Sequence, residues 1–150
     1  MGGLQARTPT RNDWTMKADT GDTSRTSPAN TSKVPSAAEA NDFICRGTFI
    51  APKKSGSSVY TAVYIQCVPA AAVIASAALD KCTRVGGPDD FSCITVARGH
   101  ASSPGKANQL LVPVYYSPCK SGHYRPRAYY QTVNGIDYPD EVGNITSVTC

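Results

Sequence analysis

Long apolar segments are absent from this sequence, and no run of basic residues is present. The longest apolar stretch, Val68 to Leu79, is interrupted by Pro69 and Ser76 and is shorter than the roughly 20 residues that a membrane-spanning helix needs. Charged residues make up only 17% of the chain, and the positive ones are too scattered to follow a phosphate backbone. We therefore expect neither a membrane nor a nucleic acid as a partner.

Groups that perform catalysis are equally scarce. The two histidines, His100 and His123, have no nucleophile motif around them and are interpreted as loop residues on the surface. The cysteines include no close pair of the kind that holds zinc or performs redox chemistry. Carboxylates at Asp89-Asp90 and around Asp140 are interpreted as solvated turns rather than as an acid–base pair or a calcium site. The sequence predicts a protein that is not an enzyme and has no cofactor.

What the sequence does contain is six widely spaced cysteines. We interpret them as structural disulfides, which form in oxidising compartments and predict a secreted, extracellular protein. Because no apolar signal segment precedes them, we expect a mature secreted chain with an added start. Pairing in order of sequence fits neighbouring or facing strands best, giving Cys45–Cys67, Cys82–Cys93 and Cys119–Cys150.

Residues 43–150 show the pattern of an all-β fold, an antiparallel β-sandwich of about seven strands. Alternating or β-branched runs are separated by turns such as Lys53 to Ser57, Ser103 to Gly105 and Asn134-Gly135. The Ala-rich stretch Pro69 to Asp80 is ambiguous, because alanine favours helix whereas Val73 and Ile74 favour strand. We assign it to a strand. The expected strands are 43–50, 59–66, 73–79, 91–97, 110–116, 124–133 and 145–150.

Residues 1–42 differ sharply from the rest, because they lack cysteine and are rich in residues that resist packing. We predict an extended or disordered arm that adds little apolar area to the folded unit. Its first part still offers anchors for extended-peptide recognition by a partner, namely Leu4, Arg7, Arg11 and the only tryptophan, Trp14. Leu4 to Arg7 would suit a trypsin-like cleft with an acidic pocket. A plain tether is the alternative.

Tyrosine accounts for 8 of the aromatic residues, beside 3 Phe and 1 Trp. Most of the tyrosines gather in the C-terminal half near Arg125 and Arg127. Tyr and Arg are favoured at surfaces that bind sugars or proteins, so we predict a partner-binding surface that includes Tyr124, Arg125 and Arg127. The alternative is that half of these tyrosines face the core of the sandwich.

Several short motifs resemble those of a known family. They are Cys45-Arg46-Gly47-Thr48, Ser55-Gly56-Ser57 before a strand that ends at Cys67, Gly122-His123-Tyr124-Arg125 after Cys119, and the terminal cysteine. Over residues 45–150 the chain resembles small secreted actinobacterial β-sandwich proteins, including the adaptor subunit of umbrella toxin particles. The resemblance implies a small adaptor that joins a large toxin subunit to lectin subunits with a trypsin-like fold, partly through its N-terminal segment.

The expected function is a non-enzymatic adaptor in a secreted antibacterial toxin/lectin complex. Its arm would insert into the cleft of a trypsin-like lectin subunit, and its sandwich would dock on a second subunit, so its partners are other secreted protein subunits. The first alternative is a secreted carbohydrate- or cell-wall-binding module that uses the Tyr and Arg cluster, with carbohydrate as its partner. The second is a small secreted enzyme or toxin whose site the sequence does not reveal.

Overall fold

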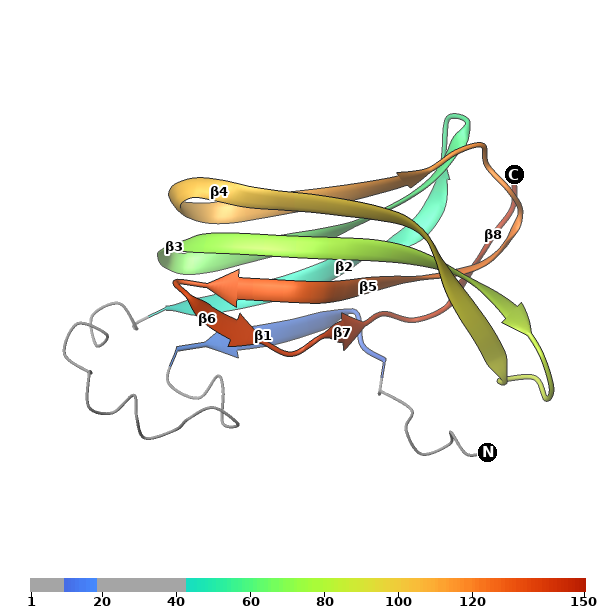
Figure 1. Cartoon of the computed structure of the whole chain (residues 1–150), viewed down its shortest axis with the longest axis horizontal. Helices are drawn as coiled ribbons and strands as arrows, with labels where there is room; N and C mark the ends of the chain where they lie inside the picture. Colours follow the sequence, from blue (N-terminus) through green and yellow to red (C-terminus); the bar gives the residue numbers. More distant parts are fainter. Residues whose placement is uncertain (1–9, 19–42) are drawn as a thin grey trace.

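The computed structural model describes residues 10–18 and 43–150, which form an antiparallel β-sandwich without any helix in these ranges (Figure 1). The predicted all-β fold is confirmed. Within the described ranges, then, no helix is present that could cross a membrane. The strands are β1 (Asp13–Lys17), β2 (Ile44–Ser55), β3 (Ser58–Arg84), β4 (Phe91–Tyr116), β5 (Gly122–Val133), β6 (Ile136–Tyr138), β7 (Glu141–Val142) and β8 (Thr146–Val148).

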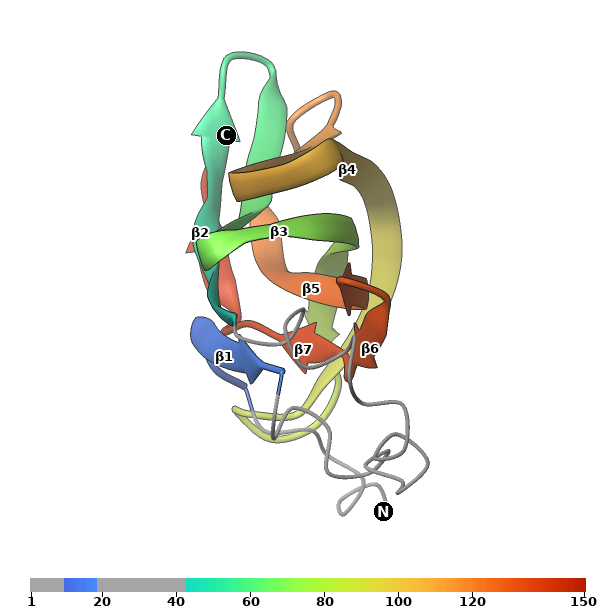
Figure 2. The same ribbon diagram turned by 90° about the vertical axis from the view of Figure 1, so that its left-hand side faces the viewer.

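Two very long strands, β3 and β4, belong to both layers of the sandwich. The first part of β3 pairs with β2 as far as Val68, and its second part pairs with β5 from Val73 onward. Strand β4 follows β3 along its other side. Both strands double back at the left-hand end of Figure 1, and Figure 2 shows the resulting curved layers. Pro69, which lacks an amide hydrogen, lies where the β3 register shifts at this crossing.

The first layer therefore contains β1, β2, residues 58–68 of β3 and residues 107–116 of β4. The second layer contains residues 71–84 of β3, residues 91–106 of β4, and β5 to β8. The strands expected at 59–66 and 73–79 are therefore both parts of β3, and those expected at 91–97 and 110–116 are both parts of β4. The turn expected at Ser103 to Gly105 lies inside β4, where the Ser103 hydroxyl bonds back to the Gly105 carbonyl at 2.6 Å.

The Ala-rich stretch is a strand, as predicted. Ala71, Ala75 and Ala77 are buried on the side of β3 that faces the core. Their small side chains leave room for larger residues from the opposite layer, and this tertiary packing outweighs the preference of alanine for helix.

Strand β1 corrects the prediction that residues before 43 add little apolar area. Trp14 and Met16 are 4% and 1% exposed, and both belong to the main hydrophobic core. The Trp14 indole Nε1 donates to Gln131 Oε1 at 2.9 Å, which links the two layers. Gly47, opposite Trp14 in β2, is required here because a Cβ would lie 2.2 Å from the indole ring. Residues 13–17 are therefore an integral edge strand of the first layer.

All six cysteines form the three disulfides predicted from the sequence: Cys45–Cys67, Cys82–Cys93 and Cys119–Cys150. The first joins β2 to β3 in the first layer, and the second joins β3 to β4 in the second layer. The third ties the segment after β4 to the chain's last residue. Three disulfides indicate an oxidising, extracellular environment.

Candidate functional site

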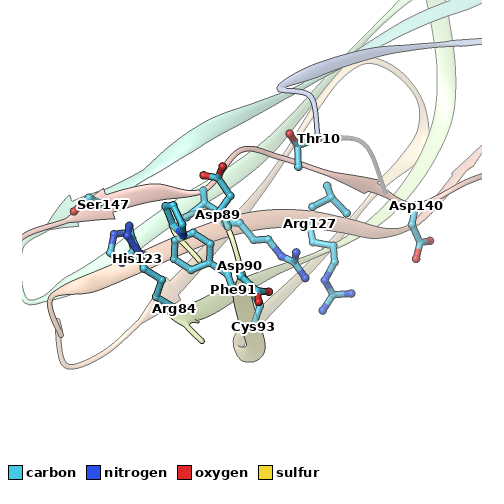
Figure 3. Close-up of a pocket in the computed structure, with 14 residues that line it drawn as sticks. Thr10, Arg84, Asp89, Asp90, Phe91, Cys93, His123, Arg127, Asp140 and Ser147 are labelled. Atoms are coloured by element: carbon cyan, nitrogen blue, oxygen red, sulfur yellow. The ribbon is translucent and has the colours of Figure 1, made fainter. Parts of the chain in front are cut away.

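A cleft of about 1030 Å³ opens on the outer face of the second layer (Figure 3). One wall is the loop that joins β3 to β4, and the other is formed by residues of β7, β8 and their flanks. Thr10, just before β1, also lines it. We call it the arginine cleft, because its charged lining residues are Arg84, Arg125, Arg127, Asp89, Asp90 and Asp140.

The arginines of the cleft are organised by a buried carboxylate. Asp80 of β3 lies between Thr95 of β4 and Arg125 of β5 in the strand register, and its side chain is only 2% exposed. Arg125 Nε donates to Asp80 Oδ2 at 2.9 Å. Arg127 donates through Nε to Oδ2 at 3.0 Å and through Nη2 to Oδ1 at 3.2 Å. The Thr95 hydroxyl donates to Oδ1 at 2.9 Å and accepts from Arg127 Nη2 at 2.6 Å.

These contacts decide the charge of Asp80. Burial by itself raises the pKa of the carboxyl, but hydrogen bonds from Arg127, Arg125 and Thr95, with the charge of Arg127, outweigh it and hold the pKa below its ordinary value. Asp80 is therefore ionised at neutral pH. Two guanidinium cations share this one carboxylate, so the cluster keeps a net positive charge.

The same contacts leave hydrogen-bond donors facing the cleft. A guanidinium carries five N–H donors, and Arg125 uses only Nε within the described part of the chain. Arg127 uses Nε and Nη2. The terminal nitrogens of Arg125 and Nη1 of Arg127 are thus held in place without a protein partner among residues 10–18 and 43–150. Fixed, partly desolvated guanidinium groups of this kind bind carboxylates and other oxyanions.

Aromatic rings flank the arginines at both ends. Arg84 Cζ lies 5.1 Å from the centroid of the Phe91 ring, and this ring lies 5.2 Å from that of His123. Tyr129, at a β-bulge of β5, lies 5.6 Å from both Arg127 Cζ and Arg98 Cζ. Such stacking restricts the arginine side chains without consuming their donors. Figure 3 shows Arg84, Phe91 and His123 together at one end of the cleft and Arg127 and Asp140 at the other.

The predicted binding residues lie in different environments. Arg125 and Arg127 line the cleft, as a binding surface requires. Trp14 and Tyr124 are core residues rather than surface anchors, being 4% and 0% exposed, and the Tyr124 hydroxyl donates to the Lys120 carbonyl at 2.6 Å. Leu4 and Arg7 lie outside the described residues.

The backbone of Arg11 fixes the start of β1, and its side chain is half exposed beside Glu141. Its amide donates to the Val142 carbonyl at 2.9 Å, and its Nε lies 3.4 Å from Glu141 Oε1. Burial raises the pKa of Glu141, an effect that the Arg11 charge opposes and the Asp140 charge reinforces. The net pKa of Glu141 is above its ordinary value, so this ion pair is a weak one.

The predicted tyrosine cluster is not one surface. Tyr138 is buried and its hydroxyl donates to the Lys17 carbonyl at 2.7 Å, whereas Tyr129 belongs to the second layer and Tyr115 to the first. Tyr115 instead faces outward beside Tyr60, with ring centroids 4.9 Å apart. Their neighbours on that face include Tyr64, whose hydroxyl bonds Gln109. We call residues 60, 64, 111, 113 and 115 the tyrosine face.

Sequence reasoning missed several residues of these surfaces. Tyr60 and Tyr64 alternate with Val59, Val63 and Ile65, so strict alternation places them on the face away from the core. Asp80 had a weaker signal, an isolated carboxylate inside an apolar strand. Its partners Arg125 and Arg127 are 45 and 47 residues away in sequence, and only the β3–β5 register brings them together.

The histidines lie in strands, not in the expected loops. His100 of β4 bonds the Ser76 hydroxyl through Nδ1 at 2.8 Å, and His123 of β5 packs on Phe91. The described residues contain no group of three or more His, Cys, Asp or Glu placed to hold a metal. Comparison with protein-family models, curated proteins and solved structures finds no match. Only the geometry of the described residues therefore bears on the function.

Proposed function

We propose that this protein is a secreted, non-enzymatic adaptor that joins other secreted protein subunits, as in an antibacterial toxin/lectin complex. The observation that carries the proposal is that the two outer faces of one disulfide-stapled sandwich present unlike surfaces. One is the arginine cleft, and the other is the tyrosine face. Two chemically different surfaces on a rigid body suit the bridging of two different partners.

The arginine cleft supplies directional recognition. Arg125 and Arg127 side chains are 29% and 23% exposed, and their orientation is fixed by Asp80 before any partner binds. A partner that offers an oxyanion therefore has little ordering of these side chains to overcome. Truncating such a preorganised, partly desolvated arginine typically weakens an interface strongly.

The tyrosine face supplies apolar contact area. Tyr115 and Leu111 are 58% and 46% exposed, and Tyr64 and Leu111 are paired across β3 and β4 on the same side. Aromatic side chains are enriched at the centres of protein interfaces, where their rings exclude water. This face is accordingly assigned to the second partner.

The N-terminal segment belongs to the proposal as a third contact. Strand β1 fixes the chain to the first layer, and Thr10 lines the arginine cleft. Leu4 and Arg7 are proposed to enter a trypsin-like partner cleft, with Trp14 holding β1 in the core instead of touching the partner.

A carbohydrate- or cell-wall-binding module is the second candidate function. It is favoured by one observation, the neighbouring Tyr60 and Tyr115 rings on an open sheet face. Adjacent exposed rings provide a platform on which the apolar faces of sugars can pack.

Co-purification from culture supernatant, read by quantitative mass spectrometry, separates these functions. An adaptor should lose one subunit in the Tyr60→Ala/Tyr115→Ala variant and a different subunit in Arg125→Gln, each by about tenfold or more. Tyr130→Ala is the matched control, because Tyr130 is 42% exposed in the other layer and lies outside the cleft. Wild-type protein that retains no subunit, but binds cell-wall polysaccharide through Tyr60 and Tyr115, would replace the adaptor by the sugar-binding function.

A further inference from the structure

We propose that the arginine cleft binds a polypeptide segment that carries acidic and basic side chains at neighbouring positions. This proposal deepens the adaptor function and rests on it, because it assigns the chemistry of the partner at that surface. The reason lies in the charges that line the cleft, of which only Arg125 and Arg127 are in ion pairs within the described residues.

Both signs of charge line the cleft in equal number. Arg84, Arg125 and Arg127 supply three positive charges, and Asp89, Asp90 and Asp140 supply three negative ones. Within the described residues, none of these three aspartates lies in an ion pair; the arginine ion pairs of the cleft go to Asp80 beneath it. Arg84, the three aspartates and the unused N–H donors of Arg125 and Arg127 remain solvated until a ligand with complementary groups of both signs contacts them.

The arrangement of these charges is fixed by the fold. The β3–β4 loop that carries Asp89 and Asp90 is closed by backbone bonds from Val85 N to Asp90 O at 2.8 Å and from Asp90 N to Gly87 O at 3.1 Å. Asp80 holds the Arg125 and Arg127 side chains in place. Asp89 and Asp90 on one wall, Asp140 on the other, and Arg125 and Arg127 of β5 therefore line the same space.

This pattern discriminates between classes of ligand. A polyanion such as a sulfated glycan or nucleic acid gains from the arginines but is repelled by three carboxylates, because like charges at close range are unfavourable. A neutral sugar would desolvate Arg84 and the three aspartates without supplying a charged partner for them. A mixed-charge peptide satisfies both signs, and Phe91 offers apolar surface for its side-chain stems.

The volume and position of the cleft agree with a short peptide. About 1030 Å³ accommodates a few residues of an extended chain rather than a folded element. Because Thr10 lines the cleft, the N-terminal contact and the cleft contact are assigned to the same subunit.

The test is a titration of the full chain with three blocked hexapeptides, followed by NMR at the arginine Nε–Hε signals. The probes are alternating Asp-Lys, all-Asp, and alternating Asn-Gln. Alternating Asp-Lys should shift the Arg125 and Arg127 signals and bind most tightly, and Arg125→Gln should weaken it by about tenfold because one charge-assisted contact is lost. Arg84→Gln is a second cleft variant. The Arg84 guanidinium stacks on Phe91 and does not bond Asp80, so this variant leaves the bonds from Arg125 and Arg127 to Asp80 intact.

Arg98→Gln is the matched control, since Arg98 lies on the same outer face and contacts Tyr129 but does not line the cleft. The proposal would be overturned if the all-Asp peptide bound more tightly than the alternating Asp-Lys peptide. It would also be overturned if Arg84→Gln, Arg125→Gln and wild type bound the Asp-Lys peptide equally. A third such result is NMR shifts that depend on protein concentration, because these would report binding of a second copy of the chain. Failure here leaves subunit co-purification unaffected, whereas failure of the adaptor function abolishes co-purification even when the peptide binds.

Discussion

Asp80 shows how one buried charge can serve both the fold and a surface. Its carboxylate is nearly inaccessible, and it is tolerated inside β3 because Arg125, Arg127 and Thr95 satisfy both of its oxygens. Removing the carboxylate would leave two neighbouring cations of β5 without their shared counterion. The acid is therefore needed to place the arginines that the cleft presents.

Asp80→Asn should lower the free energy of unfolding by about 3 kcal/mol at neutral pH, near the lower end for breaking a buried pair, because both arginines can still reach water. The folded-state pKa of Asp80 is below its ordinary 3.8, so its stabilising effect is present above pH about 4 and is lost as the pH falls through the folded pKa. Urea unfolding of wild type and variant at pH 7 and pH 3 measures both effects.

The difference in the free energy of unfolding between wild type and Asp80→Asn should be smaller at pH 3 than at pH 7. Asp89→Asn is the control, because Asp89 is exposed in the loop and has no ion pair in the described part of the chain. Glu141 acts with the opposite sign, since its raised pKa favours the fold at low pH and this effect fades as pH rises. A variant at Asp80 that keeps the wild-type pH dependence would refute the role assigned to this carboxylate.

At the scale of elements, β1 is the clearest departure from expectation. Its five residues alternate between exposed and buried, but only Trp14 and Met16 carry the apolar signal, and polar residues surround them. A pattern this short cannot reveal that Gly47 of β2, a distant part of the sequence, leaves the space in which the Trp14 indole packs. Composition made the segment look like a free arm, whereas tertiary packing makes it a strand.

Other elements were predictable because their signals are local. Alternation identified the first part of β3, and Asn134-Gly135 forms the expected tight turn, with positive φ angles of 51° and 83°, between β5 and β6. Pro and Gly near residues 69 and 104 resemble turn signals but mark bends within continuous strands. Arg125 and Arg127 could be picked out as binding residues from type alone, but Asp80 beneath them depends on register, which local sequence does not encode.

Trp14→Ala should lower the free energy of unfolding by about 3–5 kcal/mol, as for other large-to-small core substitutions. It creates a cavity against Phe49 and leaves the buried Gln131 oxygen without its donor. Chemical denaturation measures the loss, and Thr15→Ala, on the exposed side of the same strand, should change stability by less than about 0.5 kcal/mol. A Trp14→Ala protein as stable as wild type would mean that β1 is a detachable arm after all.

For the whole molecule, the disulfides are distributed so that each layer has its own bridge. Cys45–Cys67 lies in the first layer, which carries the tyrosine face, and Cys82–Cys93 lies in the second layer at the arginine cleft. Cys119–Cys150 secures the C-terminal segment that follows β8, and β8 pairs with the start of β5. Each surface of the proposed adaptor thus belongs to a layer that contains a disulfide. The disulfides help a small domain to keep its two surfaces at a fixed distance and orientation.

This distribution predicts that the bridges act regionally. Removing Cys119–Cys150, which closes 31 residues, by paired Cys→Ser substitution should cost about 4 kcal/mol through the entropy of the unfolded chain. It should also raise amide hydrogen exchange in β8 and the start of β5, where Ser147 and His123 line the cleft, while exchange at the tyrosine face stays unchanged. The matched variant lacking Cys45–Cys67 should show the reverse, with faster exchange in β2 and the first part of β3 and intact peptide binding at the cleft. Equal acceleration throughout both variants would show instead that the sandwich opens only as a single cooperative unit, and the two surfaces would then not be stabilised separately.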